Sequence, residues 1–242
     1  MFKLKKYKSQ KYWRTIMNKE LKLHNCIVSF IDILGSTKAI QDNAQESLNI
    51  VHDAYIESLK LFEKVFTNKR IKPMVKIFSD NIVIAANREG ESGHGAFLAV
   101  CMMSAIIHLE FLKRKLLTRG AISTGNFFCD DTMVWGTGLV NSYLLENKVA
   151  IYPRIIIDPK LIGELKIAID GEKYHSSKWL IQDNDGIFFV HYYNDCITDK
   201  DFVILLLLRI VSDKIVEYTG NPNICQKWIW YSNFLQQFII EK

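Results

Sequence analysis

The stretch Ile27-Val28-Ser29-Phe30-Ile31-Asp32-Ile33-Leu34-Gly35-Ser36-Thr37 decides the fold of this chain. An apolar, β-branched run leads to a carboxylate at Asp32, and a Gly-Ser-Thr turn then opens a long amphipathic segment. Because a helix N-terminus presents unpaired N–H groups and a partial positive charge, Gly35 to Thr37 can receive a phosphate group. Asp32 beside it can hold the divalent cation that neutralises the phosphate. An ordinary capped strand-to-helix turn is the alternative interpretation.

The composition indicates a globular protein with a substantial core: 242 residues, of which 49% are hydrophobic. The net charge is only +5, and much of the excess lies in residues 1–23, which we expect to form a solvated basic arm. The five cysteines show no paired spacing, which favours a reducing compartment. Since the longest apolar run, 202–208, is far shorter than the roughly 20 residues that span a bilayer and no signal-peptide pattern is found, we expect a cytoplasmic protein without stable membrane association.

Hydrophobic periodicity over residues 24–168 predicts an α+β domain, with helices on one face of a mainly antiparallel sheet. The helices follow periods of three and four, and the strands are β-branched runs between turn residues. In order, the expected elements are a strand 26–33, a helix from 36 to about 66, a hairpin 74–78 and 82–86, a buried helix 96–116, strands 119–124 and 127–134, a short helix 136–146, and a strand 153–158.

The character of the sequence changes near residue 170. Residues 179–182 and 187–192 flank Asp183-Asn184-Asp185-Gly186, which is a strong hairpin signal. Two helices are then expected, 199–218 and 224–240. We therefore divide the chain into the arm 1–23, a main domain 24–168, and a C-terminal hairpin and two-helix extension 169–242.

Three motifs occur in order on these elements. They are the stretch from Phe30 to Thr37, the hairpin sequence Lys76-Ile77-Phe78-Ser79-Asp80, and Arg119-Gly120-Ala121-Ile122-Ser123-Thr124-Gly125, which leads to Trp135-Gly136 and Leu145-Glu146. Together they resemble the catalytic domain of class III nucleotidyl cyclases over about residues 24–160. The resemblance implies the ferredoxin-like α+β fold of that domain.

The resemblance also implies roles for the charged residues. Asp32, Asp80 and the backbone carbonyl of Ile33 would hold two Mn²⁺ or Mg²⁺ ions, and Leu34, Gly35, Ser36, Thr37 and Arg119 would bind the triphosphate. The chemistry agrees, since closing a nucleotide's 3′-oxygen onto its own α-phosphorus suits two divalent ions roughly 3.5–4 Å apart. A guanidinium donates two hydrogen bonds to phosphate at once. The implied catalytic set is Asp32, Asp80 and Arg119. The alternative interpretations are that Asp80 is merely a residue favoured in hairpin turns, and that Arg119 is a surface arginine paired with a nearby acid.

The chain departs from the class III pattern where that pattern reads a purine and stabilises the transition state. Met133, Val140 and Leu144 stand where the pattern has Asp, Asn and Arg, and none of the three can donate or accept through its side chain in their place. This combination resembles the pyrimidine cyclases of bacterial Pycsar anti-phage defence. That resemblance implies a homodimer with shared active sites, a manganese-type ion, and cyclic UMP or cyclic CMP as a signal for a separate effector that is not bound directly.

The expected base pocket consists of Lys76, Met133 and Phe30. Because a Lys donor suits the two carbonyls of uracil, we expect UTP to be the favoured substrate. The alternatives are a cytidylate cyclase, an adenylate cyclase that reads adenine through Lys76, and a catalytically silent cyclase-fold sensor. Binding to nucleic acid is not favoured, because no interleaved aromatic and basic pattern is present.

Overall fold

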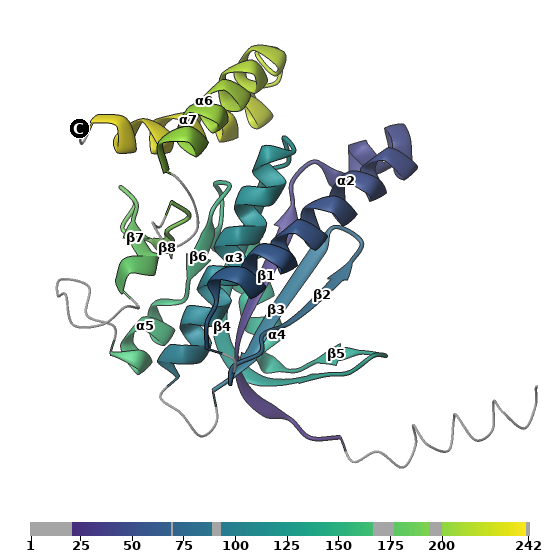
Figure 1. Ribbon diagram of the computed structural model, residues 1–242, viewed down its shortest axis with the longest axis vertical. Helices are drawn as coiled ribbons and strands as arrows, with labels where there is room; N and C mark the ends of the chain where they lie inside the picture. Colours follow the sequence, from purple (N-terminus) through teal and green to yellow (C-terminus); the bar gives the residue numbers. More distant parts are fainter. Residues whose placement is uncertain (1–20, 69, 89–92, 167–176, 194–199, 241–242) are drawn as a thin grey trace, which may run out of the picture.

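The computed structural model describes residues 21–68, 70–88, 93–166, 177–193 and 200–240 (Figure 1). The predicted basic arm lies almost wholly outside these residues. One sheet organises the fold, with the strand order β2-β3-β1-β4-β6-β8-β7. Its strands are β1 (His24–Ile33), β2 (Met74–Phe78), β3 (Asn81–Asn87), β4 (Thr118–Cys129), β6 (Ile155–Ile157), β7 (Leu180–Gln182) and β8 (Phe188–Val190). β1 lies between β3 and β4 and is antiparallel to both.

Alternation along β1 sends successive side chains to two different layers. Ile27 and Ile31 pack in the main core beneath the helix α3 (His94–Lys113), where Ser104 Oγ donates to Ser29 Oγ at 3.1 Å. Val28 and Phe30 face a second, smaller cluster on the opposite side of the sheet. α3 alone among the described helices has the length and hydropathy of a membrane span, but 89% of that segment is buried inside the fold, as expected of a core helix.

Helix α2 (Ser36–Val65) begins where the sequence predicts. Gly35 precedes it with φ of +80°, a conformation that a side chain would strain. The helix is not continuous, because Asn43 takes φ −156° and ψ 91° and introduces a kink. Beyond the kink, Ala54, Ser58 and Phe62 form the buried stripe that packs beside α3.

The predicted pair of strands around Gly125 is a different structure. β4 continues unbroken to Cys129, and only β5 (Val134–Trp135) returns against it. The turn between them forms because Asp130 Oδ1 accepts hydrogen bonds from the backbone N–H groups of Thr132 and Met133. The segment Asp130-Asp131-Thr132, which lies inside the predicted strand 127–134, therefore forms the turn itself.

Helix α4 (Thr137–Val149) lies against β4 and β1 on the face opposite α3, so it departs from the predicted arrangement of helices on one face. Glycines permit this close contact. A Cβ at Gly125 would stand 2.6 Å from the backbone nitrogen of Gly138, and Gly136 has φ of +135° with Asn126 O 2.1 Å from the position of a Cβ. Helix and strand backbones meet directly here.

The C-terminal segment extends the same sheet, because β8 pairs with β6. A helix that the sequence analysis missed, α5 (Pro159–Leu165), follows β6; Asp158 caps it by accepting from the backbone nitrogen of Lys160. The two predicted helices are α6 (Lys200–Glu217) and α7 (Pro222–Ile240), which pack on each other at the end of α3 (Figure 1). The proposed boundary near residue 168 stays a prediction, because residues 167–176 lie outside the described part.

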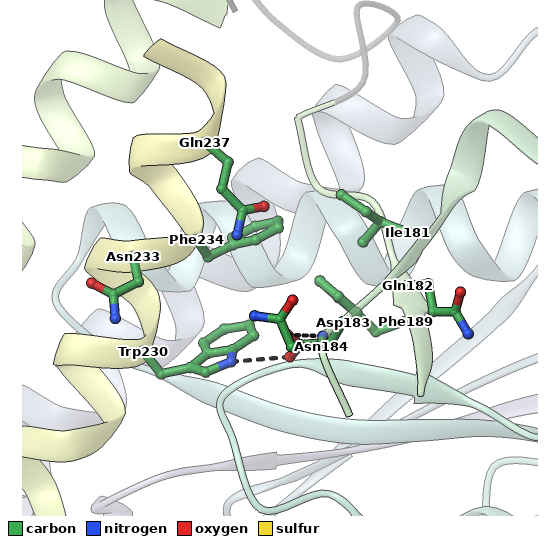
Figure 2. Close-up of a pocket in the computed structure, with 9 residues that line it drawn as sticks. All are labelled: Ile181, Gln182, Asp183, Asn184, Phe189, Trp230, Asn233, Phe234 and Gln237. Atoms are coloured by element: carbon green, nitrogen blue, oxygen red, sulfur yellow. Dashed lines mark hydrogen bonds between the residues drawn. The ribbon is translucent and has the colours of Figure 1, made fainter. Parts of the chain in front are cut away.

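A hollow of about 140 Å³ lies between the β7–β8 hairpin and α7, and Figure 2 shows the residues that line it. Trp230 Nε1 donates to Asp183 Oδ2 at 3.1 Å across it, and the buried Arg154 forms ion pairs with Asp183 and Asp185. The carboxylate of Asp183 is thus already paired with both Arg154 and Trp230. We interpret the hollow as part of the packing contact between the C-terminal extension and the sheet.

Candidate functional site

The ends of β1 and β3 bring the two predicted metal carboxylates together. Asp32 is paired in register with Asn81, the residue after Asp80. The backbone nitrogen of Ile33 donates to the backbone oxygen of Asp80 at 2.9 Å, and Ser36 Oγ donates to Asp80 Oδ2 at 2.6 Å. The strand end, the hairpin tip and the start of α2 thus form one hydrogen-bonded unit.

The two carboxyl groups differ electrostatically. Burial raises the pKa of Asp32, and the charge of Asp80 raises it further, whereas Arg119 and Lys227 lower it. The pKa of Asp80 is lowered, chiefly because Ser36 donates a hydrogen bond to the charged form. A carboxylate pair with like-charge repulsion is stabilised by a cation placed between its members.

The donor set fits a hard divalent ion. The structure shows no group of three His, Cys, Asp or Glu side chains with metal-binding geometry within its described ranges. Two carboxylates with one backbone carbonyl leave open positions, which suits Mg²⁺ or Mn²⁺, ions that take oxygen ligands and share them with substrate phosphates. The predicted ligands Asp32, Ile33 and Asp80 are compatible with that chemistry.

Arg119, the second residue of β4, lies beside the acids and pairs in register with Asp32. Its Nη2 is 3.7 Å from Asp32 Oδ2, and its Nε is 2.6 Å from Glu146 Oε1, an ion pair poorly aligned for a hydrogen bond. Glu146 is almost fully buried; burial raises its pKa, while Arg119 opposes the shift. Arg119 is therefore held inward by two carboxylates and is not a surface arginine.

Sequence reasoning quoted Glu146 only as part of a motif and missed its contact with Arg119. Glu146 lies on the same buried face of α4 as Gly138 and Ser142, at a spacing of four residues. A glutamate on a buried helix face needs a charged partner, and this signal could have revealed the contact with Arg119. Sequence reasoning also missed Lys227 of α7, whose charge acts on both Asp32 and Arg119. No local pattern connects Lys227 to these residues, because they are far apart in the sequence.

The predicted phosphate loop needs one correction. The backbone nitrogen of Leu34 donates to Leu117 O at 2.9 Å and its side chain packs against the core, so Leu34 has no N–H to offer a phosphate. The hydroxyl of Ser36 is committed to Asp80. Gly35 keeps open space around its Cα, and the first N–H groups of α2 have no intrahelical partner. The usable part of the loop is the backbone from Gly35 to Thr37.

The predicted base-pocket residues occupy the second face of the sheet. Lys76 pairs in register with Val83, and Val83 pairs with Phe30, so the side chains of Lys76 and Phe30 point to the same face of the sheet. Met133 lies in the turn between β4 and β5. Lys76 Nζ lies 4.0 Å from Asp131 Oδ1 in the turn that carries Met133. Phe30 itself is buried, and its ring lies edge-to-face with that of Tyr143, with the ring centroids 5.3 Å apart.

The structure exposes a group of apolar side chains on β5 and α4, including the two positions where the resemblance expects Asn and Arg. Val140 is 52% exposed and Leu144 is 40% exposed. The group consists of Met133, Trp135, Val140, Tyr143 and Leu144. A patch of this kind commonly marks an interaction surface.

No protein-family profile matches the sequence, and no curated protein matches it significantly. Among solved structures, the monomeric guanylyl cyclase domain of the RhoGC fusion protein from the aquatic fungus Blastocladiella emersonii is similar, with a TM-score of 0.51 and 14% identity over 71% of this chain and 98% of that one. The chain has the fold of a class III nucleotidyl cyclase catalytic domain.

Two further solved structures of cyclases are similar to this chain, with lower TM-scores. The adenylyl cyclase CyaB from P. aeruginosa has a TM-score of 0.48 and 17% identity, covering 72% of this chain and 96% of that one. A bacterial light-regulated adenylyl cyclase has a TM-score of 0.43 and 11% identity, covering 86% and 66%. The predicted α+β class III fold is confirmed by the similarity to the RhoGC cyclase domain.

Proposed function

We propose that this chain is a nucleotidyl cyclase, which converts a ribonucleoside triphosphate into a 3′,5′-cyclic nucleotide and pyrophosphate. The observation that carries the proposal is the meeting of Asp32 and Asp80 at neighbouring strand ends with Arg119 beside them. A fold needs no such cluster for stability, because grouping like charges is costly. Substrate phosphates and their counter-ions explain it.

Each residue of the site has a distinct task. Asp32, Asp80 and the Ile33 carbonyl would hold two Mn²⁺ or Mg²⁺ ions, which when bound favour ionisation of the 3′-hydroxyl and stabilise the leaving pyrophosphate. Ser36 keeps Asp80 ionised and oriented through its hydrogen bond. Glu146 pairs with Arg119 Nε and so orients the guanidinium beside Asp32, where its Nη groups can donate to phosphate oxygens. The backbone from Gly35 to Thr37 receives the triphosphate.

UTP is the substrate that we propose, with cyclic UMP as the product. Lys76 supplies a donor and Met133 supplies apolar bulk, so the pocket suits carbonyl oxygens better than an exocyclic amine. The position of Lys76 near the turn that carries Met133 supports placing both at one base. The resemblance to pyrimidine cyclases of anti-phage defence, with a separate effector and a cytoplasmic location, belongs to this same proposal.

The proposed enzyme works as a homodimer with shared sites. The exposed apolar patch of β5 and α4, defined above, supports this arrangement, because burying it against a second copy removes large side chains from water. Met133 belongs to that patch, and Lys76 Nζ lies 4.0 Å from Asp131 Oδ1 in the same turn, so a partner's cleft can reach the base-reading residues.

The test is to incubate the purified chain with each of the four ribonucleoside triphosphates and Mn²⁺ and to identify products by mass. We expect cyclic UMP, and we expect Asp32→Asn and Asp80→Asn to lower its rate at least about 100-fold. Asp53→Asn, at an exposed carboxylate on α2, is the matched control and should leave the rate unchanged. No cyclic product from any substrate would refute the cyclase, and cyclic AMP as main product would refute the base assignment.

A catalytically silent nucleotide sensor is the second candidate. Val140 and Leu144 favour it, because neither can hydrogen-bond to a developing negative charge. The same samples decide between the two, since a sensor binds triphosphate without forming a cyclic product.

A further inference from the structure

Hydrogen bonds hold both oxygens of the Asp80 carboxylate. Ser36 Oγ donates to Asp80 Oδ2 at 2.6 Å, and Asn81 Nδ2 donates to Asp80 Oδ1 at 3.1 Å. The two donors belong to different elements, since Ser36 is the first residue of α2 and Asn81 is the first residue of β3. Because the donors come from separate parts of the fold, a partial rotation of the carboxylate about its Cβ–Cγ bond weakens these hydrogen bonds.

The backbone that carries this carboxylate is fixed as well. Phe78 pairs in register with Asn81, so the two residues between them, Ser79 and Asp80, form a tight hairpin turn. Ser79 has φ of +55°, which is uncommon for a residue with a side chain. The backbone oxygen of Asp80 accepts from the nitrogen of Ile33 at 2.9 Å. The turn is thereby tied to the end of β1, and Asp80 keeps one position relative to that strand.

The carboxylate of Asp32 is held less tightly than that of Asp80. Its ion-pair partner Arg119 approaches Oδ2 with Nη2 at 3.7 Å, which is longer than a hydrogen bond. Asp32 therefore can adjust its orientation to an ion, whereas Asp80 presents its oxygens in one direction. The candidate metal site thus combines an adjustable carboxylate with a fixed one.

Divalent ions of different size make different demands on a carboxylate. Mg²⁺ requires near-ideal octahedral geometry with oxygens at about 2.0–2.1 Å, and Mn²⁺ also suits octahedral oxygen sites. Ca²⁺ takes about six to eight oxygens at about 2.3–2.6 Å and often uses both oxygens of one carboxylate. Each oxygen of Asp80 keeps a lone pair for an ion beside its hydrogen bond. Turning both oxygens toward a single large ion requires a rotation that the two hydrogen bonds oppose, so a fixed Asp80 favours the smaller ions.

We propose that Ser36 and Asn81 are positioning residues that make the site select Mn²⁺ or Mg²⁺ over Ca²⁺, by holding the carboxylate of Asp80 in one orientation. This inference rests on the metal-dependent function proposed above. Both residues act through Asp80, as hydrogen-bond partners of a metal ligand commonly do. The hydroxyl of Ser36, which the sequence led us to expect at the triphosphate, therefore serves the metal ligand.

The experiment measures metal binding to the full chain without nucleotide, so the readout does not depend on turnover. Mn²⁺ binding is followed by the loss of the electron paramagnetic resonance signal of free Mn²⁺, and Ca²⁺ binding by competition with Mn²⁺. We expect the wild type to bind Mn²⁺ more tightly than Ca²⁺. Ser36→Ala and Asn81→Ala should each weaken Mn²⁺ binding by about 10-fold or more, the usual cost of losing such a partner. Ca²⁺ binding should weaken less, so the ratio of the Ca²⁺ to the Mn²⁺ dissociation constant should fall at least about threefold.

The chain offers a matched control for each variant. Ser58 is a buried serine of the same helix as Ser36, and its hydroxyl donates to the backbone oxygen of Ala54. Asn87 lies at the exposed other end of β3. Ser58→Ala and Asn87→Ala should keep the wild-type ratio of dissociation constants. Ser36→Thr, which keeps a hydroxyl, should restore the ratio to within about twofold of the wild type.

The outcomes separate this inference from the proposed function. A wild-type ratio in both Ala variants, even with weaker binding of both ions, would overturn the selection by Ser36 and Asn81 and leave the cyclase proposal standing. Mn²⁺ binding by the wild type that is no tighter than that of Asp80→Asn would overturn the metal site itself. Thermal melts confirm that each variant is folded, and Asn81→Ala carries the test if Ser36→Ala melts early.

Discussion

His108 should make the stability of this protein depend on pH in a calculable way. The imidazole is fully buried between Thr118 and Tyr231 and stacks on Tyr192 with ring centroids 3.8 Å apart. Burial lowers the pKa of His108 from 6.5 to about 3. The folded state therefore keeps a neutral ring where the unfolded chain takes up a proton.

The sign follows from that difference. Above pH 6.5 both states are neutral at this residue, so it adds no pH dependence. As the pH falls from 6.5 toward 3, protonation favours the unfolded chain by about 1.4 kcal/mol per pH unit. Between pH 7.5 and 5.5 the free energy of unfolding should fall by about 1.4 kcal/mol on account of His108, and any folded-state pKa well below 5.5 gives the same value.

The assay is urea denaturation of the wild type and of His108→Gln at both pH values. The variant lacks the titrating ring, so the stability difference between the two proteins should shrink by about 1.4 kcal/mol from pH 7.5 to 5.5. His52→Gln, at an exposed histidine of α2, controls for the general effect of removing an imidazole. A difference that stays constant across the two pH values would refute the buried, neutral ring.

Two further predictions concern stability. Gly136→Ala should destabilise the fold by at least about 2 kcal/mol in urea denaturation, because φ is +135° and Asn126 O stands 2.1 Å from the position of a Cβ; Gly163→Ala, in open space on α5, should be neutral or stabilising, and equal effects at the two glycines would contradict the strain. A double-mutant cycle of Glu146→Ala and Arg119→Ala should give a coupling above about 1 kcal/mol, since the pair is 2.6 Å apart and Glu146 is buried. The exposed Lys60–Glu57 pair should couple far more weakly, and a coupling at Glu146 as small as that would show that Arg119 is not held there.

Local chemistry determined the elements that the sequence predicts correctly. The apolar, β-branched run of β1, the turn residues Ser79-Asp80-Asn81 and the Gly-Ser-Thr helix start act within a few residues. They can therefore be recognised without the fold. The same signals placed Asp32, Asp80 and Arg119 at element ends, where the structure has them. The extent of β4 and the helix α5 were missed, because a mid-strand Gly and a Pro look like interruptions before their packing is known.

Only the tertiary structure decided which groups meet at the site. The pairing of Glu146 with Arg119, the hydrogen bond of Ser36 to Asp80, and the loss of the Leu34 N–H to Leu117 all join elements that no sequence period relates. The buried hydrogen bond between His108 and Tyr231 likewise joins residues that are more than 100 positions apart in the chain. Hydrophobic periodicity determines which face of an element is buried, whereas side-chain packing and paired polar groups determine what that face touches.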